Sequence, residues 1–160
     1  VGGDSHSPTG GAFGAYMFGI GSTEMLGVMV TGELWVRVPE TIRMQWNHRL
    51  SPGVTAKDMA LHLVGRFGMN GGQYQAVEFC GPAVQALSMQ ERMTLSNMSA
   101  EMGAQAGLIA PDATTRDWLG NGFDTDLAKD DDGYLAGKLR AINYAEWNKP
   151  GRAPCHTQIP

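Results

Sequence analysis

The stretch TAKDMALHLVGRF, residues 55–67, and the run AVEF, residues 76–79, decide the fold. Thr55 is a good N-cap, and apolar side chains recur on one helical face from Met59 to Phe67, so the spacing predicts a helix that begins at Ala56 and ends at Phe67. The short apolar run that follows the glycine-rich turn is typical of a buried strand. A helix followed directly by such a strand is the repeating unit of an α/β fold.

The chain on both sides of this unit continues the alternation of helices and strands. Residues Thr41–Asn47 alternate apolar with polar side chains, which predicts a half-buried strand. The other expected elements are the end of a buried strand at Val1–Asp4, a loop at Ser5–Gly11, a helix over Ala12–Thr31, a helix over Met89–Ala106, a strand at Leu108–Ala110 and a helical stretch from Pro111 to Leu119. The pattern predicts an α/β architecture with a mostly parallel sheet covered by helices.

The expected helix over residues 12–31 is rich in glycine and alanine. An isolated glycine weakens a helix by about 1 kcal/mol relative to alanine. Several glycines on one segment therefore indicate that another backbone or a ligand comes close to it. Tight packing of a helix on the sheet and close approach to a ligand both explain this pattern.

Composition and charge exclude several classes of protein. A length of 160 residues is enough to bury one core, and a net charge of −4 argues against binding to a nucleic-acid backbone. The two cysteines, Cys80 and Cys155, are too few for a disulfide framework and for an all-cysteine iron–sulfur or zinc site. No segment resembles a signal peptide or a membrane span, so we expect a cytoplasmic protein. The abrupt start at Val1 leads us to expect that an upstream part is missing.

The organisation changes after residue 120. Residues 1–120 are expected to form a compact α/β domain segment, and residues 121–160 an acidic linker, a short helix at Tyr134–Trp147 and a proline-rich tail. The aspartates between Asp124 and Asp132 could be read as a calcium loop. A solvated surface loop is the better interpretation, because no carboxylate stands at the twelfth position that an EF-hand requires.

Asp4, Ser5 and His6 are the first candidate site residues. They combine a carboxylate, a hydroxyl and an imidazole at the expected carboxyl end of a strand, where open α/β sheets bind their ligands. On an extended backbone Asp4 and His6 point to the same side and could reach one cleft. The alternative is a loop in which Asp4 and Ser5 make turn hydrogen bonds and His6 is merely exposed.

Asn97 and Glu101 are the second pair of candidates. They stand four residues apart, so on a helix they share one face. Their neighbours are mostly apolar, and a buried glutamate needs a charged or hydrogen-bonding partner, which an imidazolium would supply. The alternative is that Glu101 simply faces water. No two histidines have the spacing of metal ligands, and no residue is assigned to a metal.

With these residues and the motifs around them, the chain resembles the aconitase superfamily, in particular its isopropylmalate dehydratase branch. The resemblance runs from Val1 to about Leu119 and implies an aconitase-type layered domain. It is carried by Gly3-Asp4-Ser5-His6, Gly11-Ala12-Phe13-Gly14, Phe18-Gly19-Ile20-Gly21-Ser22-Thr23-Glu24, Pro52-Gly53-Val54-Thr55-Ala56-Lys57-Asp58, Val77-Glu78-Phe79-Cys80-Gly81, Ala86-Leu87-Ser88-Met89, Arg92-Met93-Thr94, Asn97-Met98 and Gly107-Leu108-Ile109-Ala110-Pro111-Asp112.

The resemblance implies a hydro-lyase that dehydrates and rehydrates a hydroxy-di- or tricarboxylic acid of the malate type. It implies a [4Fe–4S] cluster acting as a Lewis acid, and a catalytic serine supplied by another segment or a small subunit. It also implies roles for the candidate residues. Asp4, His6 and Glu101 would be catalytic: Asp4 would orient a histidine encoded upstream, and Glu101 would fix the tautomer of His6. Ser5 would bind a substrate carboxylate, and Asn97 would contact the iron-bound water or the substrate.

The chain also departs from the family pattern. The Gly-Ser-Cys-Thr-Asn and Cys-x-x-Cys motifs that hold the family's cluster are absent from this chain. Where relatives read Gly-Gly-Thr-Gly, this chain has Gly71-Gly72-Gln73-Tyr74. Two further readings follow: a cluster-less, degenerate module that binds or supports a partner, and a cluster-free dehydratase in which Asp4, His6 and Glu101 hold another metal.

Overall fold

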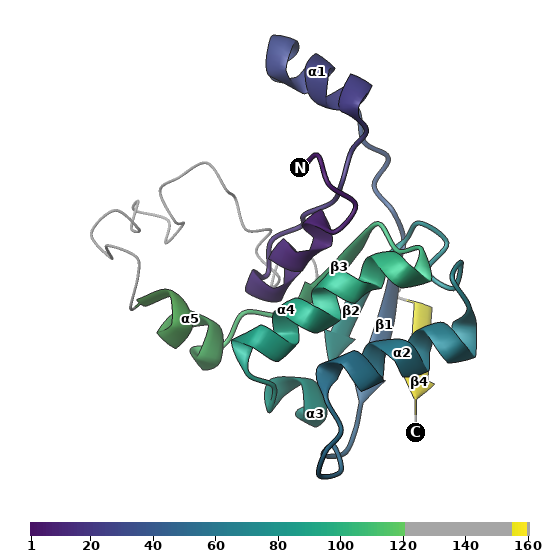
Figure 1. Cartoon of the computed structure of the whole chain (residues 1–160), viewed down its shortest axis with the longest axis vertical. Coiled ribbons are helices and arrows are strands. Elements are labelled where there is room, and N and C mark those ends of the chain that lie inside the picture. The colour runs from purple at the N-terminus through teal and green to yellow at the C-terminus, as the bar shows by residue number, and fades with distance from the viewer. Residues whose placement is uncertain (121–154, 160) are drawn as a thin grey trace.

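A parallel sheet lies at the centre of the molecule (Figure 1). The computed structural model describes residues 1–120 and 155–159, and within these residues the strand order is β3-β2-β1-β4. All three pairings are parallel, and the register places Ala76 opposite both Thr41 and Ala106. The strands are β1 (Thr41–Trp46), β2 (Ala76–Cys80), β3 (Ala106–Ile109) and β4 (Cys155–Ile159).

Helices connect β1 to β2 and β2 to β3, as parallel pairing requires. Helices α2 and α4 pack against each other and cover one face of the sheet, and the 3₁₀ helix η1 packs against α4 and β3 (Figure 1). The helices are η1 (Ser7–Phe13), α1 (Ser22–Thr31), α2 (Ala56–Phe67), α3 (Pro82–Gln85), α4 (Met89–Asn97), the 3₁₀ helix η2 (Met98–Met102) and α5 (Ala113–Gly120). This arrangement confirms the expected α/β class.

The core forms where α2 and α4 meet the sheet. Phe79 of β2, Leu63 of α2 and Leu95 of α4 are each at most 2% exposed. Burying a side chain of this size stabilises the fold by roughly 1.5–3 kcal/mol. Helix α2 begins as expected, because the Thr55 side chain accepts a hydrogen bond from the Asp58 backbone and the Asp58 carboxylate accepts one from the Thr55 backbone.

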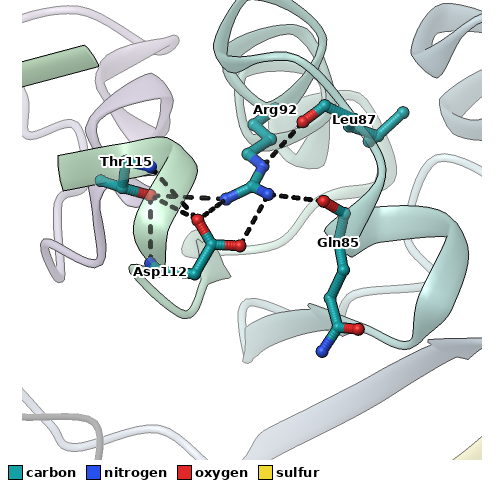
Figure 2. A network of polar contacts seen from close by, with 5 residues as sticks. All are labelled: Gln85, Leu87, Arg92, Asp112 and Thr115. Carbon is teal, nitrogen blue, oxygen red and sulfur yellow. Dashed lines mark hydrogen bonds and ion pairs between the residues drawn. The ribbon is translucent and has the colours of Figure 1, made fainter. Parts of the chain in front are cut away.

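A buried arginine joins α4 to α5 (Figure 2). The Arg92 guanidinium is fully buried and makes a bidentate pair with Asp112, with both N–O distances at 2.8 Å. It also donates to the backbone carbonyls of Leu87 and Gln85, and Thr115 contacts the same group. The hydrogen bonds from Arg92 lower the pKa of the Asp112 carboxyl. The network compensates a charge that could not otherwise be buried.

Glycines divide the helix that was expected over residues 12–31. Gly14 has a φ of 80° and ends η1, the chain then runs extended, and α1 begins only at Ser22. Gly19 lies so close to the turn at Asp4 that a Cβ there would lie 2.3 Å from the Asp4 carbonyl oxygen. Gly19 therefore does allow close approach of another backbone, but outside a helix, whereas a Cβ on Gly27 within α1 would meet no atom within 4 Å.

Other boundaries differ for local reasons. The helix expected over Met89–Ala106 ends as an α-helix at Asn97, continues as η2 and stops at Gly103, whose φ is 72°. Strand β3 consequently begins at Ala106, two residues before the expected strand. At the amino end, the expected buried strand Val1–Asp4 is only a single bridge between Gly2 and Gly19, and most of the expected loop Ser5–Gly11 is η1.

Helix α1 extends away from the rest of the molecule (Figure 1). None of its residues is buried, and Leu26, Met29 and Val30 are 61–78% exposed. Trp35, which follows the helix, is 87% exposed. The segment therefore receives little stabilisation from the described part of the chain.

The carboxyl-terminal expectations lie mostly outside the described residues. This applies to the acidic linker, the calcium loop reading and the helix at Tyr134–Trp147, and the division at residue 120 stays a prediction. Within the expected proline-rich tail, residues Cys155–Ile159 form β4 beside β1. Over residues 1–120 and 155–159 no helix has the length and apolar character needed to span a membrane; the cytoplasmic location stays a prediction.

Candidate active site

The imidazole of His6 and the carboxylate of Glu101 meet at the surface. The distance from His6 Nε2 to Glu101 Oε1 is 3.0 Å, although 95 residues separate them in the sequence. His6 immediately precedes η1 and Glu101 belongs to η2, so the contact joins two 3₁₀ helices. The two side chains are 41% and 51% exposed, which leaves the pair accessible to a ligand. The expected pairing is present, and Glu101 does not simply face water.

Hydrogen bonds on both ring nitrogens define the tautomer of His6. A carboxylate can only accept, so Nε2 carries a proton toward Glu101. In the neutral ring Nδ1 is then an acceptor, and it lies 3.0 Å from the Ser5 hydroxyl. The pair therefore places a proton on Nε2 and leaves Nδ1 facing the hydroxyl of Ser5.

Asp4 takes part in a turn and does not extend toward Glu101. Its Oδ1 accepts a hydrogen bond of 2.6 Å from the His6 backbone N–H, and its carbonyl accepts one from the Ser7 hydroxyl. The backbone is therefore not the extended chain that would direct both side chains to one side. Asp4 orients the His6 main chain, as in an Asx turn.

Asn97 lies at the last residue of α4 and donates from Nδ2 to the Thr9 hydroxyl at 2.9 Å. Because the α-helix ends there, Asn97 and Glu101 do not share one face of a single α-helix. They nevertheless both contact the segment His6–Thr9, Asn97 through Thr9 and Glu101 through His6. The structure thus gathers all five sequence-predicted residues around the start of η1.

Small residues allow η1, β3 and η2 to pack closely together. A Cβ on Gly11 would lie 1.8 Å from the Gly107 carbonyl oxygen, and a Cβ on Gly107 would lie 2.5 Å from Ser99 Oγ. Pro8 is buried in the first turn of η1, where its missing N–H has no intrahelical partner to lose. Close packing of η1 on β3 and η2 is what holds His6 opposite Glu101.

A separate cleft of about 580 Å³ lies next to the turn at residues 71–74. Tyr74 and the mostly buried Gln105 line it, and none of the five candidate residues does. Tyr16 donates a hydrogen bond to Gln105, and burial raises the pKa of the Tyr16 hydroxyl. Sequence reasoning missed Tyr16, Gln105 and Thr9, because a lone polar residue carries no pattern.

The described residues do not fit an iron–sulfur cluster. Across residues 1–120 and 155–159 no three His, Cys, Asp or Glu residues gather in a way that could hold a metal ion. Cys80 lies at the end of β2 and accepts a hydrogen bond from Arg43 Nε at 3.1 Å. The reading in which Asp4, His6 and Glu101 bind another metal is not supported either, since Asp4 is engaged with the His6 backbone.

The fold and the site define an α/β domain segment that carries an exposed imidazole–carboxylate pair beside several hydroxyl and amide groups. The chain belongs to the aconitase family: the family model described as "Aconitase family (aconitate hydratase)" matches residues 1–140.

Three curated relatives agree with this assignment. A 3-isopropylmalate dehydratase large subunit from Desulfatibacillum aliphaticivorans is 46% identical over 118 residues, and a 3-isopropylmalate dehydratase large subunit 1 from Pyrococcus abyssi is 47% identical over 119 residues; each alignment covers 74% of this chain and 28% of the relative. A probable methanogen homoaconitase large subunit from Methanosarcina mazei is 50% identical over 121 residues, covering 76% of this chain and 31% of the relative. The chain thus spans less than a third of the length of these relatives.

Proposed function

We propose that this chain is part of a hydro-lyase of the aconitase–isopropylmalate dehydratase type, which dehydrates and rehydrates a malate-like hydroxy-di- or tricarboxylic acid. The observation that carries the proposal is the 3.0 Å contact between His6 and Glu101. Such a reaction has to protonate a leaving hydroxyl, and an imidazole held by a carboxylate is suited to hold and move that proton. The similarity to relatives named as dehydratase and homoaconitase subunits supports the same reaction class.

Each candidate residue has a role in this proposal. Glu101 fixes the His6 tautomer with the proton on Nε2, which leaves Nδ1 as the nitrogen that can accept a proton. Asp4 acts by orienting other residues. Its carboxylate holds the main chain of His6. Its proposed orientation of a second histidine, encoded upstream of this chain, rests on the family resemblance. Ser5 is positioned to exchange its hydrogen bond with His6 for one with a substrate carboxylate. Asn97 contacts the substrate hydroxyl or the departing water.

Membership of the aconitase family implies a [4Fe–4S] cluster. The described residues do not provide ligands for this cluster. We propose that the cluster ligands lie in parts of the protein outside residues 1–120 and 155–159. The relatives' names as large subunits support a small-subunit partner, and we propose that it or another segment supplies the catalytic serine.

The test is a hydration assay on the complete enzyme, in which this chain is assembled with the further segments or subunits it requires. Ultraviolet absorbance of the unsaturated acid follows turnover of malate-type substrates, and iron and sulfide are measured on the same sample. We expect turnover that is severely reduced in His6→Ala. A complete assembly that neither binds a cluster nor turns over any such acid would refute the proposal and indicate a degenerate binding module.

A further inference from the structure

The hydroxyl of Thr9 connects the two halves of the candidate site. Thr9 Oγ1 donates to the His6 backbone carbonyl at 2.7 Å and accepts from Asn97 Nδ2 at 2.9 Å. His6 in turn contacts Glu101, which follows Asn97 by four residues. Thr9 therefore closes a ring of contacts between the segment before η1 and the junction of α4 with η2.

Counting protons fixes the orientation of the Asn97 amide. A hydroxyl has one proton, and Thr9 uses it on the carbonyl of His6. The amide atom that faces Thr9 must therefore be a donor, which is Nδ2. Asn97 Oδ1 then points away from Thr9, and among residues 1–120 and 155–159 no hydrogen bond to Oδ1 is present. The free oxygen can accept a hydrogen bond from a ligand hydroxyl or a water.

We propose that Thr9 is a positioning residue for the dehydration: its hydroxyl holds the Asn97 amide with the nitrogen bound and the oxygen presented as an acceptor beside the His6–Glu101 pair. The inference rests on the proposed function, because the hydrogen-bond partner that it gives to Asn97 Oδ1 is the hydroxyl that leaves the substrate or the water that adds to it. Without the Thr9 hydroxyl the amide is free to rotate and can offer nitrogen in place of oxygen, which would repel the proton of that hydroxyl.

Two substitutions separate positioning from packing. Thr9→Val keeps the shape of the side chain and removes the hydroxyl, whereas Thr9→Ser keeps the hydroxyl. In the complete enzyme we expect Thr9→Val to lower kcat/KM roughly 5- to 10-fold, the effect of one lost hydrogen bond, and Thr9→Ser to stay within about twofold of the unchanged enzyme.

A double-mutant cycle tests whether Thr9 acts through Asn97. If it does, Thr9→Val has no further effect on kcat/KM once Asn97 is replaced by alanine. A Thr9→Val effect that is equally large with and without Asn97 would overturn the proposal, because Thr9 would then act by another route. An unfolding midpoint that falls while kcat/KM stays unchanged would also overturn it and leave Thr9 a purely structural residue.

Crystal structures of the two variants give a readout that does not depend on activity. We expect the Asn97 amide to keep its orientation in Thr9→Ser and to rotate in Thr9→Val. An unchanged amide in Thr9→Val would refute positioning even if the enzyme is active. If the unchanged enzyme turns over no malate-type acid, the proposed function fails, while the rotation of the amide still decides whether Thr9 positions Asn97.

Discussion

Replacing Glu101 with glutamine should separate catalysis from stability. The His6–Glu101 pair is 41% and 51% exposed, and water screens an ion pair at such a position. Its contribution to the free energy of unfolding is therefore below about 1 kcal/mol. Glutamine keeps the shape and an oxygen acceptor for Nε2, so we expect the fold and the contact to persist.

The effect of Glu101→Gln on turnover should be much larger. Glutamine removes the negative charge that lies beside the His6 ring, and positioned acid–base groups contribute about 10²- to 10⁴-fold to rate. A hundredfold loss of kcat/KM corresponds to about 2.7 kcal/mol of transition-state stabilisation. In Glu101→Gln the loss of transition-state stabilisation should therefore exceed the loss of unfolding free energy by more than about 1 kcal/mol.

Urea unfolding and hydration kinetics on the complete enzyme provide the comparison. Glu33→Gln is the matched control, because it makes the same change of charge at an exposed residue that follows α1; it should alter neither quantity. Full activity in Glu101→Gln would show that the carboxylate has no part in the reaction. A loss of unfolding free energy above 2 kcal/mol would show that the pair is structural.

Three further predictions concern stability, each measured by chemical denaturation. Asp112→Asn should cost about 3 kcal/mol at neutral pH, since it leaves the buried Arg92 without its countercharge. The pKa of Asp112 is lowered from 3.8 in the folded state. The contribution of the Arg92–Asp112 pair to the free energy of unfolding is therefore complete above pH 3.8 and is lost as the pH falls through the folded-state pKa. Over that range the difference in unfolding free energy between Asp112→Asn and the wild-type protein should narrow. Tyr74→Gly should stabilise the chain by about 0.5–1 kcal/mol, because Tyr74 has a φ of 57° and is 63% exposed; no gain would show that the turn is unstrained. Gly11→Ala should lower the free energy of unfolding by at least about 2 kcal/mol, because the new Cβ clashes with the β3 backbone. Gly27→Ala should stabilise α1 by up to about 1 kcal/mol, because its Cβ would meet no atom within 4 Å. Equal effects of the two substitutions would contradict the close packing of η1 on β3.

The sequence predicted those elements whose signals are local. Helix α2 agrees with its expected bounds because the Thr55 cap, the apolar period and Gly68 all lie within or next to it. The helix expected over 12–31 is confirmed only over Ser22–Thr31, because no local pattern reports the close contact of Gly19 with the Asp4 backbone. The end of α4 at Asn97 was missed because no glycine or proline marks it, and the next glycine is Gly103 after η2.

The candidate residues were singled out from their chemistry and spacing, but the pairing of His6 with Glu101 could be anticipated only through the resemblance. Nothing near His6 or Glu101 indicates a contact across 95 residues, and local evidence alone favoured an exposed glutamate. Asp4 illustrates the limit of the backbone argument: its expected direction depended on an extended strand, and the chain turns instead. Thr9 escaped notice because a threonine in a loop is ordinary until its two partners are known.

Helix α1 has a consequence for how this chain behaves in solution. A ten-residue helix with no buried side chain lies below the length at which isolated helices persist in water. Its amide hydrogens should therefore exchange with deuterium far faster than those of α2, at a rate close to that of an unstructured peptide. Slow exchange there would reveal that something covers Leu26, Met29 and Val30 and supplies the missing stabilisation.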